Sequence, residues 1–227
     1  MIGWGGSLFL LGLFQKIVVA DGILAPVADK VYENANIPDT ITAWAGTLAF
    51  SGQIFCDFAG YSTCAIGVAL CLGFVLPDNF KFPYAAIGFA DFWKRWHISL
   101  SSWLRDYLYI SLGGNRKGTT RNYFNIMATM FLGGLWHGAS WTFVAWGCFH
   151  GFYLIIERIL KKTIPPSAIW KKSPIKILLS IFTFLLVCFT WVFFRSRNFK
   201  QAFEIIKSMA GVNGQGINLL SKYDIVT

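Results

Sequence analysis

Long uninterrupted apolar runs constrain this chain more than any other feature of its sequence. They cover Ile2–Val19, Ile41–Leu76, Tyr123–Glu157 and Ile177–Phe194. A helix needs about 20 apolar residues to cross the ~30 Å hydrocarbon core of a bilayer. Only 14% of the residues are charged, against roughly 25% in soluble domains. The sequence therefore predicts an all-α, polytopic membrane helix bundle over residues 1–227, with no separate soluble domain.

Two of these runs are too long for one upright span. Ile41–Leu76 would measure roughly 54 Å as a single helix, at ~1.5 Å per residue. We expect two segments there, broken near Gly60. We expect Tyr123–Glu157 to enter the membrane and return, with a re-entrant turn in the glycine-rich run Gly133–Gly138. Polar residues and prolines predict a connection over Asp21–Asp39 and a loop over Pro77–Pro83.

The net charge of +9 resides mainly in segments between the apolar runs. This placement favours anionic lipid headgroups over nucleic acid as the partner. The basic loops Gly113–Asn122 and Lys161–Lys176 flank Tyr123–Glu157, so the positive-inside rule places both in the cytoplasm. His137 would then lie within the bilayer or across it. The same count leaves four cations outside, against the rule: Arg195, Arg197, Lys200 and Lys207.

The segment Phe89–Ile110 is amphipathic and predicts a helix lying at the membrane interface. Its apolar face carries Trp93, Trp96, His97, Leu100, Leu104, Tyr107 and Leu108, and its polar face carries Lys94, Arg95, Ser102, Arg105 and Asp106. A second, short amphipathic helix is predicted after the last span. Asn198 would cap it, with Phe199, Phe203 and Ile206 on one face. Gly211–Thr227 reads as a loop.

The three histidines, His97, His137 and His150, all occur in apolar segments. An ionisable group within a membrane is costly, which makes it a candidate for function. The alternative is a neutral imidazole that is hydrogen-bonded in the bundle, and the residues alone favour that alternative for His150. Imidazole suits a general base acting on a hydroxyl. No GxSxG or Cys–His signature offers a covalent nucleophile, so direct transfer is the simpler scheme.

Other polar residues leave their roles open. Gln53 and Asp57 lie four apart and could line a polar passage or form a buried structural pair. Arg105 and Asp106 could contact substrate or form an interfacial ion pair. The histidines are too far apart in sequence for a compact ligand motif, so we expect no metal. The five cysteines form no CxxC pair and predict neither a disulfide framework nor a zinc site.

Several motifs resemble the bacterial branch of the MBOAT (membrane-bound O-acyltransferase) family. Asp91–Tyr107, DFWKRWHISLSSWLRDY, is similar to the family's first histidine motif, and Gly133–Trp141, GGLWHGASW, is similar to its second. Leu112–Gly118 also matches. Further similarity lies at Leu13–Asp21 and Gln53–Gly67, and the resemblance covers about Gly3–Arg197. Members are longer, with helices before the segment that begins at Met1, so we expect this chain to be a partial domain.

The resemblance implies specific roles for these residues. His137 matches the catalytic histidine, and His97 matches a second polar position of the site. The family fold is a helix bundle in which a tunnel and an outward-facing funnel meet near the catalytic histidine. We expect further substrate- or tunnel-lining residues among those close to the motifs and the polar positions: Trp136, Trp96, Gln53, Asp57, Asn125, Ser99 and Arg105.

The alginate O-acetyltransferase type is the most similar subgroup, because the turn GGNRKG favours it over the D-alanyl-transfer branch that acts on teichoic acid. The resemblance implies a multi-pass protein of the bacterial inner membrane. The donor would be acetyl-CoA or an acyl-carrier thioester, with no bound cofactor. The acceptor would be an exported polysaccharide or a periplasmic acetyl-relay protein.

Two non-enzymatic readings compete with acyl transfer. In a transporter or channel subunit, His97, His137 and Asp57 would line a proton or substrate path. The sequence contains no internal repeat, which carriers often show. In a scaffold, the chain would recruit a periplasmic partner independently of both motif histidines.

Overall fold

The computed structural model describes residues 1–34, 36–164, 172–213 and 216–220. The secondary structure of these residues consists of helices and turns, apart from one isolated β-bridge between Pro38 and Ile217. This confirms the predicted all-α class. The described residues form two compact units, Met1–Asp78 with Arg195–Thr227, and Asn79–Phe194. Parts of the second basic loop and of the C-terminal loop lie outside the described residues.

The first unit begins with one continuous helical run. It comprises α1 (Ile2–Phe14), the π-helical segment η1 (Gln15–Leu24) and α2 (Ala25–Tyr32). The predicted polar connection from Asp21 is therefore wrong over its first twelve residues. Pro26 is the second residue of α2 and comes just after the π-helical segment η1. The charge of Asp21 is paired with Lys16 at 2.9 Å, which lets it remain in a helix.

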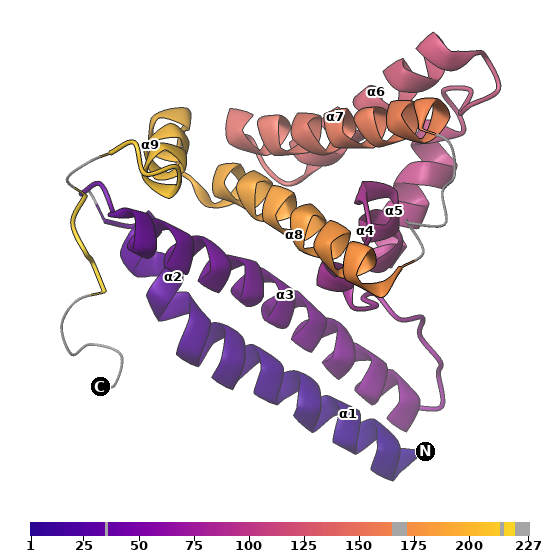
Figure 1. Ribbon diagram of the computed structural model, residues 1–227. Helices are drawn as coiled ribbons and strands as arrows, with labels where there is room; N and C mark the ends of the chain where they lie inside the picture. Colours follow the sequence, from indigo (N-terminus) through magenta and orange to yellow (C-terminus); the bar gives the residue numbers. More distant parts are fainter. Residues whose placement is uncertain (35, 165–171, 214–215, 221–227) are drawn as a thin grey trace. The chain divides into compact units, whose positions relative to one another are not determined.

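Helix α3 (Thr40–Cys71) is unbroken, so the predicted break near Gly60 is wrong. It lies beside α1 (Figure 1), and the two helices meet through glycines. A Cβ atom at Gly60 would lie 2.7 Å from the carbonyl oxygen of Gly12, and one at Gly12 would lie 2.7 Å from the nitrogen of Cys64. The glycines thus allow close helix packing rather than a turn. Asp39 caps α3 by accepting the N–H of Thr42 at 2.7 Å.

Helix α9 (Phe199–Met209) confirms the predicted cap, because Asn198 Oδ1 accepts the N–H of Gln201 at 2.9 Å. Phe199 and Phe203 share a face as predicted, with ring centroids 6.3 Å apart, but the buried face is a different one. Ala202, Ile205 and Ser208 are buried, whereas Phe203 is 53% exposed. Small side chains let α9 approach α3, where Trp44 donates its indole N–H to the carbonyl of Met209 at 3.0 Å.

Arg195, which opposed the positive-inside rule, has acidic partners in the same unit. Its guanidinium lies 2.6 Å from Asp29 and 3.3 Å from Glu33. Part of the positive charge counted after the last span is therefore balanced locally.

The second unit is built from short and long helices. They are η2 (Pro83–Ala85), α4 (Phe89–Arg95), α5 (Ile98–Trp103), η3 (Leu104–Tyr109), α6 (Thr119–Trp136), α7 (Trp141–Thr163) and α8 (Ser173–Arg195). The last residue of α8, Arg195, is counted with the first unit. The single helix predicted over Phe89–Ile110 was wrong. Trp96 is extended and His97 has a left-handed φ of +43°, so the chain bends between α4 and α5.

Helices α6 and α7 form a hairpin (Figure 1), which confirms the predicted turn in the glycine-rich run. Within the described residues, four helices are long and apolar enough to cross a membrane: Ile2–Tyr32, Thr40–Cys71, Trp141–Thr163 and Ser173–Arg195. Many of their large apolar side chains are exposed, as lipid-facing residues would be.

Candidate active site

His137 follows directly on the last residue of α6, and its ring is held on two sides. Nδ1 lies 2.7 Å from the carbonyl oxygen of Gly133. A carbonyl oxygen only accepts hydrogen bonds, so Nδ1 carries the proton and Nε2 carries the lone pair. The ring packs edge-to-face on Trp136, Trp146 and Phe194, with centroid distances of 5.0, 4.9 and 5.3 Å. His137 is thus an oriented, partly buried imidazole.

Burial sets the protonation state of both motif histidines. It lowers the pKa of His137 below 6.5, although the bond to Gly133 acts in the opposite direction. Burial also lowers the pKa of His97 to about 4, and repulsion from a charged His137 contributes. Both rings are neutral at pH 7, and a neutral imidazole with a lone pair can accept a proton.

A layer of stacked indoles joins the two histidine motifs. His137 contacts Trp146, which stacks on Trp191 at 5.7 Å. Trp191 in turn contacts Trp96 at 5.1 Å, and Trp96 directly precedes His97. All three indoles are at least 96% buried. The structure therefore brings the first and second motifs, forty residues apart, onto one rigid aromatic platform.

His97 has its polar partners on a different segment from His137. Its Nδ1 lies 3.3 Å from Asn79 Oδ1 and 3.4 Å from Ser99 Oγ. Asn79 belongs to the loop before α4 and was not among the predicted site residues. Its sequence position gave no signal, because its partners lie 18 and 20 residues further along the chain.

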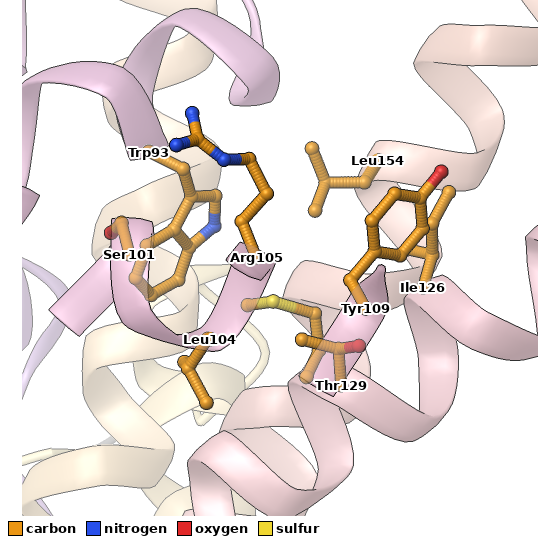
Figure 2. Close-up of a pocket in the computed structure, with 9 residues that line it drawn as sticks. Trp93, Ser101, Leu104, Arg105, Tyr109, Ile126, Thr129 and Leu154 are labelled. Atoms are coloured by element: carbon orange, nitrogen blue, oxygen red, sulfur yellow. The ribbon is translucent and has the colours of Figure 1, made fainter. Parts of the chain in front are cut away.

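A cavity of about 140 Å³ lies beside this platform (Figure 2). Figure 2 shows the indole of Trp93 on one side and the phenol of Tyr109 on the other, with the side chain of Arg105 between them in this view. Trp93 packs on Trp146 at 5.9 Å, and Trp146 contacts the ring of His137, so two indoles link the cavity wall to that ring. The cavity is lined by Trp93, Ser101, Leu104, Arg105, Tyr109, Ile126, Thr129, Met130 and Leu154.

Glu157 of α7 fixes the start of α4, a second relationship that the sequence did not reveal. Its Oε2 accepts the N–H groups of Phe89 at 2.7 Å and Ala90 at 2.9 Å. Thr183 Oγ1 accepts the neighbouring N–H of Gly88 at 2.9 Å. The helix that carries Trp93 is therefore anchored to both α7 and α8.

The remaining predicted residues lie in varied surroundings. Trp136 is 64% exposed beside His137, whereas Asn125 is fully buried and donates its amide N–H to the carbonyl of Gly114 at 2.9 Å. Arg105 lines the cavity and pairs with Asp106 at 2.8 Å. His150 is buried with Nε2 3.0 Å from Thr190 Oγ1, as a structural imidazole would be.

Gln53 and Asp57 belong to the other unit. Asp57 pairs with Lys16 at 2.5 Å. The side-chain amide oxygen of Gln53, Oε1, is buried without a hydrogen-bond partner among the described residues. Their expected role at the substrate stays a prediction, as it does for Ser99 and Asn125. Within the described parts of the chain, no three His, Cys, Asp or Glu side chains gather as metal ligands would.

Comparisons with known proteins agree with the motifs. The family model described as MBOAT, membrane-bound O-acyltransferase family, matches residues 7–196. A probable alginate O-acetylase AlgI of Azotobacter vinelandii is 44% identical over 98% of this chain and 43% of its own length. A peptidoglycan O-acetyltransferase of Helicobacter pylori is 41% identical over 97% of this chain and 41% of its own.

A teichoic acid D-alanyltransferase of Bacillus subtilis is more distant, at 32% identity over 66% of this chain and 40% of its own length. The chain spans about two fifths of the length of the curated relatives it matches.

Proposed function

This chain belongs to the membrane-bound O-acyltransferase family, and on that premise we propose that its protein transfers an acetyl group across the bacterial inner membrane. The donor is a thioester on the cytoplasmic side, either acetyl-CoA or an acyl-carrier thioester, with no bound cofactor. The acceptor is a hydroxyl group of an exported cell-surface polysaccharide, alginate-like in type, or of a periplasmic relay protein.

The state of His137 is the observation that carries this proposal. Its Nδ1 is occupied by the Gly133 carbonyl, and burial keeps the ring neutral, so Nε2 is a ready proton acceptor. A positioned, unprotonated imidazole nitrogen is the group that acyl transfer to a hydroxyl needs as its general base.

The reaction then follows by direct transfer. Nε2 of His137 takes the proton of the acceptor hydroxyl while its oxygen attacks the thioester carbonyl carbon. The new C–O bond forms, the C–S bond breaks, and the departing thiolate takes the proton back from His137. No covalent enzyme intermediate is needed, because base and acceptor act in one step.

Acetyl transfer is favoured over D-alanyl transfer by similarity. The O-acetylating relatives are 41–44% identical over nearly the whole chain, whereas the B. subtilis D-alanyltransferase is 32% identical over 66% of it. D-alanyl transfer to teichoic acid remains the second candidate. A transporter or scaffold subunit has weaker support, because it gives the oriented base no task.

Chemical analysis of the cell surface tests this function. His137→Ala is introduced into the natural protein, and ester-linked acetyl and D-alanyl groups are measured on surface polymers and secreted polysaccharide. We expect acetyl ester to fall to background at unchanged protein abundance. Trp4→Phe, a change at a 67% exposed side chain of α1 that lies outside both motifs, is the control and retains acetylation. Loss of D-alanyl ester instead identifies the second candidate, and loss of neither contradicts acyl transfer.

A further inference from the structure

The side chain of Asn79 lies at the centre of a hydrogen-bond cluster around His97. Its Oδ1 accepts the backbone N–H of Ser99 at 3.1 Å and the hydroxyl of Ser99 at 3.0 Å, and it lies 3.3 Å from His97 Nδ1. Its backbone carbonyl accepts the N–H of Ile98 at 2.9 Å. One residue of the loop before α4 thus contacts His97 and the two residues that follow it.

These contacts determine where the proton on the His97 ring lies. The backbone N–H of Ser99 can only donate, so the Asn79 atom facing it is the amide oxygen. The Ser99 hydroxyl gives its hydrogen to the same oxygen. Both neighbours of His97 Nδ1, Asn79 Oδ1 and Ser99 Oγ, therefore offer lone pairs. Nδ1 must carry the hydrogen, and Nε2 is left with the lone pair.

The same cluster holds an unfavourable backbone conformation. His97 has φ +43°, a left-handed value that histidine rarely adopts. The segment before α4 is paired with the residues around it, because Lys81 N–H donates to the Arg95 carbonyl at 2.9 Å and Ile98 N–H donates to Asn79. Asn79 also satisfies the first free N–H groups of α5 from outside the helix. The bend at His97 therefore depends on this loop.

The two motif histidines are therefore prepared in the same way. The Gly133 carbonyl fixes the tautomer of His137, and Asn79 does so for His97. We propose that Asn79 is a positioning residue that holds His97 as its Nδ1–H tautomer, so that the Nε2 lone pair serves the acyl-transfer site. This inference rests on the proposed function. In that tautomer, Nε2 accepts a hydrogen bond from a second hydroxyl of the acceptor and helps to orient the reacting hydroxyl toward His137.

The test combines a spectroscopic measurement with a rate. The natural protein is labelled with ¹⁵N-histidine in lipid bilayers, and the His97 signals are identified by their absence in His97→Gln. Solid-state NMR at pH 7 then distinguishes Nδ1–H from Nε2–H. We expect Nδ1–H in the unchanged protein and in Asn79→Asp, which keeps the accepting oxygen. Asn79→Leu, similar in size without an acceptor, loses this signal in favour of Nε2–H or a mixture.

Acyl transfer is measured on the same samples. We expect Asn79→Leu to lower the rate by about tenfold to a hundredfold, the scale on which residues that orient an imidazole act. Asn79→Asp retains the rate, and so does the control Asn36→Leu, which changes an exposed asparagine outside the motifs. An Nδ1–H signal that survives Asn79→Leu, or an unchanged rate in that variant, overturns the inference.

Failure of the proposed function would look different. The unchanged protein would then transfer no acetyl group, while the His97 tautomer would still report on Asn79. The role of Asn79 in fixing the ring is thus decided separately from the identity of the reaction.

Discussion

The Nδ1 atom of His137 lies 2.7 Å from the carbonyl oxygen of Gly133, four residues earlier in the chain. The end of α6 makes this contact available. The backbone N–H of His137 bonds to Gly134 at 3.1 Å, one residue short of the regular α-helical partner, which leaves the Gly133 carbonyl free. The imidazole takes the place of the missing N–H. Helix termination thus fixes the tautomer of the proposed base.

The pH dependence of transfer follows from the lowered pKa of His137. A base must be unprotonated to act, so the rate should be constant above pH 6.5 and fall only at lower pH. We expect the acid limb of kcat/KM, measured in liposomes, to have its midpoint below 6.5. A midpoint at or above 6.5 would contradict the buried, neutral state of this ring.

The stability of the folded protein should also decrease as the pH is lowered. Burial lowers the pKa of His97 to about 4 in the folded protein, below its ordinary value of 6.5, so the unfolded chain binds the proton first as pH falls. The two states bind protons equally above pH 6.5, and the folded state loses stability between pH 6.5 and about 4. Over this pH interval, the thermal unfolding temperature of His97→Gln should fall less than that of the unchanged protein.

Close packing of the α6–α7 hairpin predicts that Gly134→Ala is destabilising. A Cβ atom there would overlap the carbonyl oxygen of Phe143 and lie 3.2 Å from Val144 Cα. The backbone cannot move aside as a flexible side chain can, so we expect the unfolding free energy of Gly134→Ala to fall by about 1–3 kcal/mol. Thermal unfolding in lipid nanodiscs measures it.

Gly6→Ala is the matched control, because a Cβ atom at Gly6 of α1 meets nothing within 4 Å. Alanine is the better helix former, so this variant should be unchanged or more stable by up to about 1 kcal/mol. Equal effects of the two substitutions would show that the hairpin is not packed as described.

Glu157 predicts a link between α7 and the first motif. Its carboxylate accepts two N–H groups at the start of α4 and pairs with Lys161. Glu157→Ala leaves these donors without a partner, so we expect a loss of about 1–2 kcal/mol in the unfolding free energy. Hydrogen exchange of the Phe89 and Ala90 amides should also accelerate.

Glu157→Gln keeps one accepting oxygen and should lose less stability than Glu157→Ala. Glu204→Ala, in α9 of the first unit, should leave their exchange unchanged. Slow exchange at Phe89 and Ala90 in Glu157→Ala would rule out the cap.

The helices were largely predictable from the sequence, but their breaks were not. Apolar runs indicated the long helices because burial in lipid requires length and composition alone. Gly60 and Asp21 misled because the role of each is set by its contact with another residue and not by its own residue type. Gly60 packs on Gly12, and Asp21 pairs with Lys16. The bend at His97 was hidden because its helical periodicity continues across it.

The candidate site was predictable in its motifs and less so in its supports. His97 and His137 were identified by resemblance, and the structure joins their motifs through three indoles. Asn79 and Glu157 were missed. Each acts on residues 18 to 68 positions away, and a single polar side chain at the end of an apolar run carries no local signal of that.

The role of His137 as the base is tested most directly by single-turnover transfer with the natural protein in lipid nanodiscs. Acyl donor is supplied in excess, and acceptor ester is followed in the unchanged protein, His137→Gln and His137→Ala. Thermal unfolding of each sample shows that the variants are folded. We predict a transfer rate lower by about 10²–10⁴-fold in both variants, the contribution expected of a general base. A folded variant that transfers at the rate of the unchanged protein would contradict the assignment of His137.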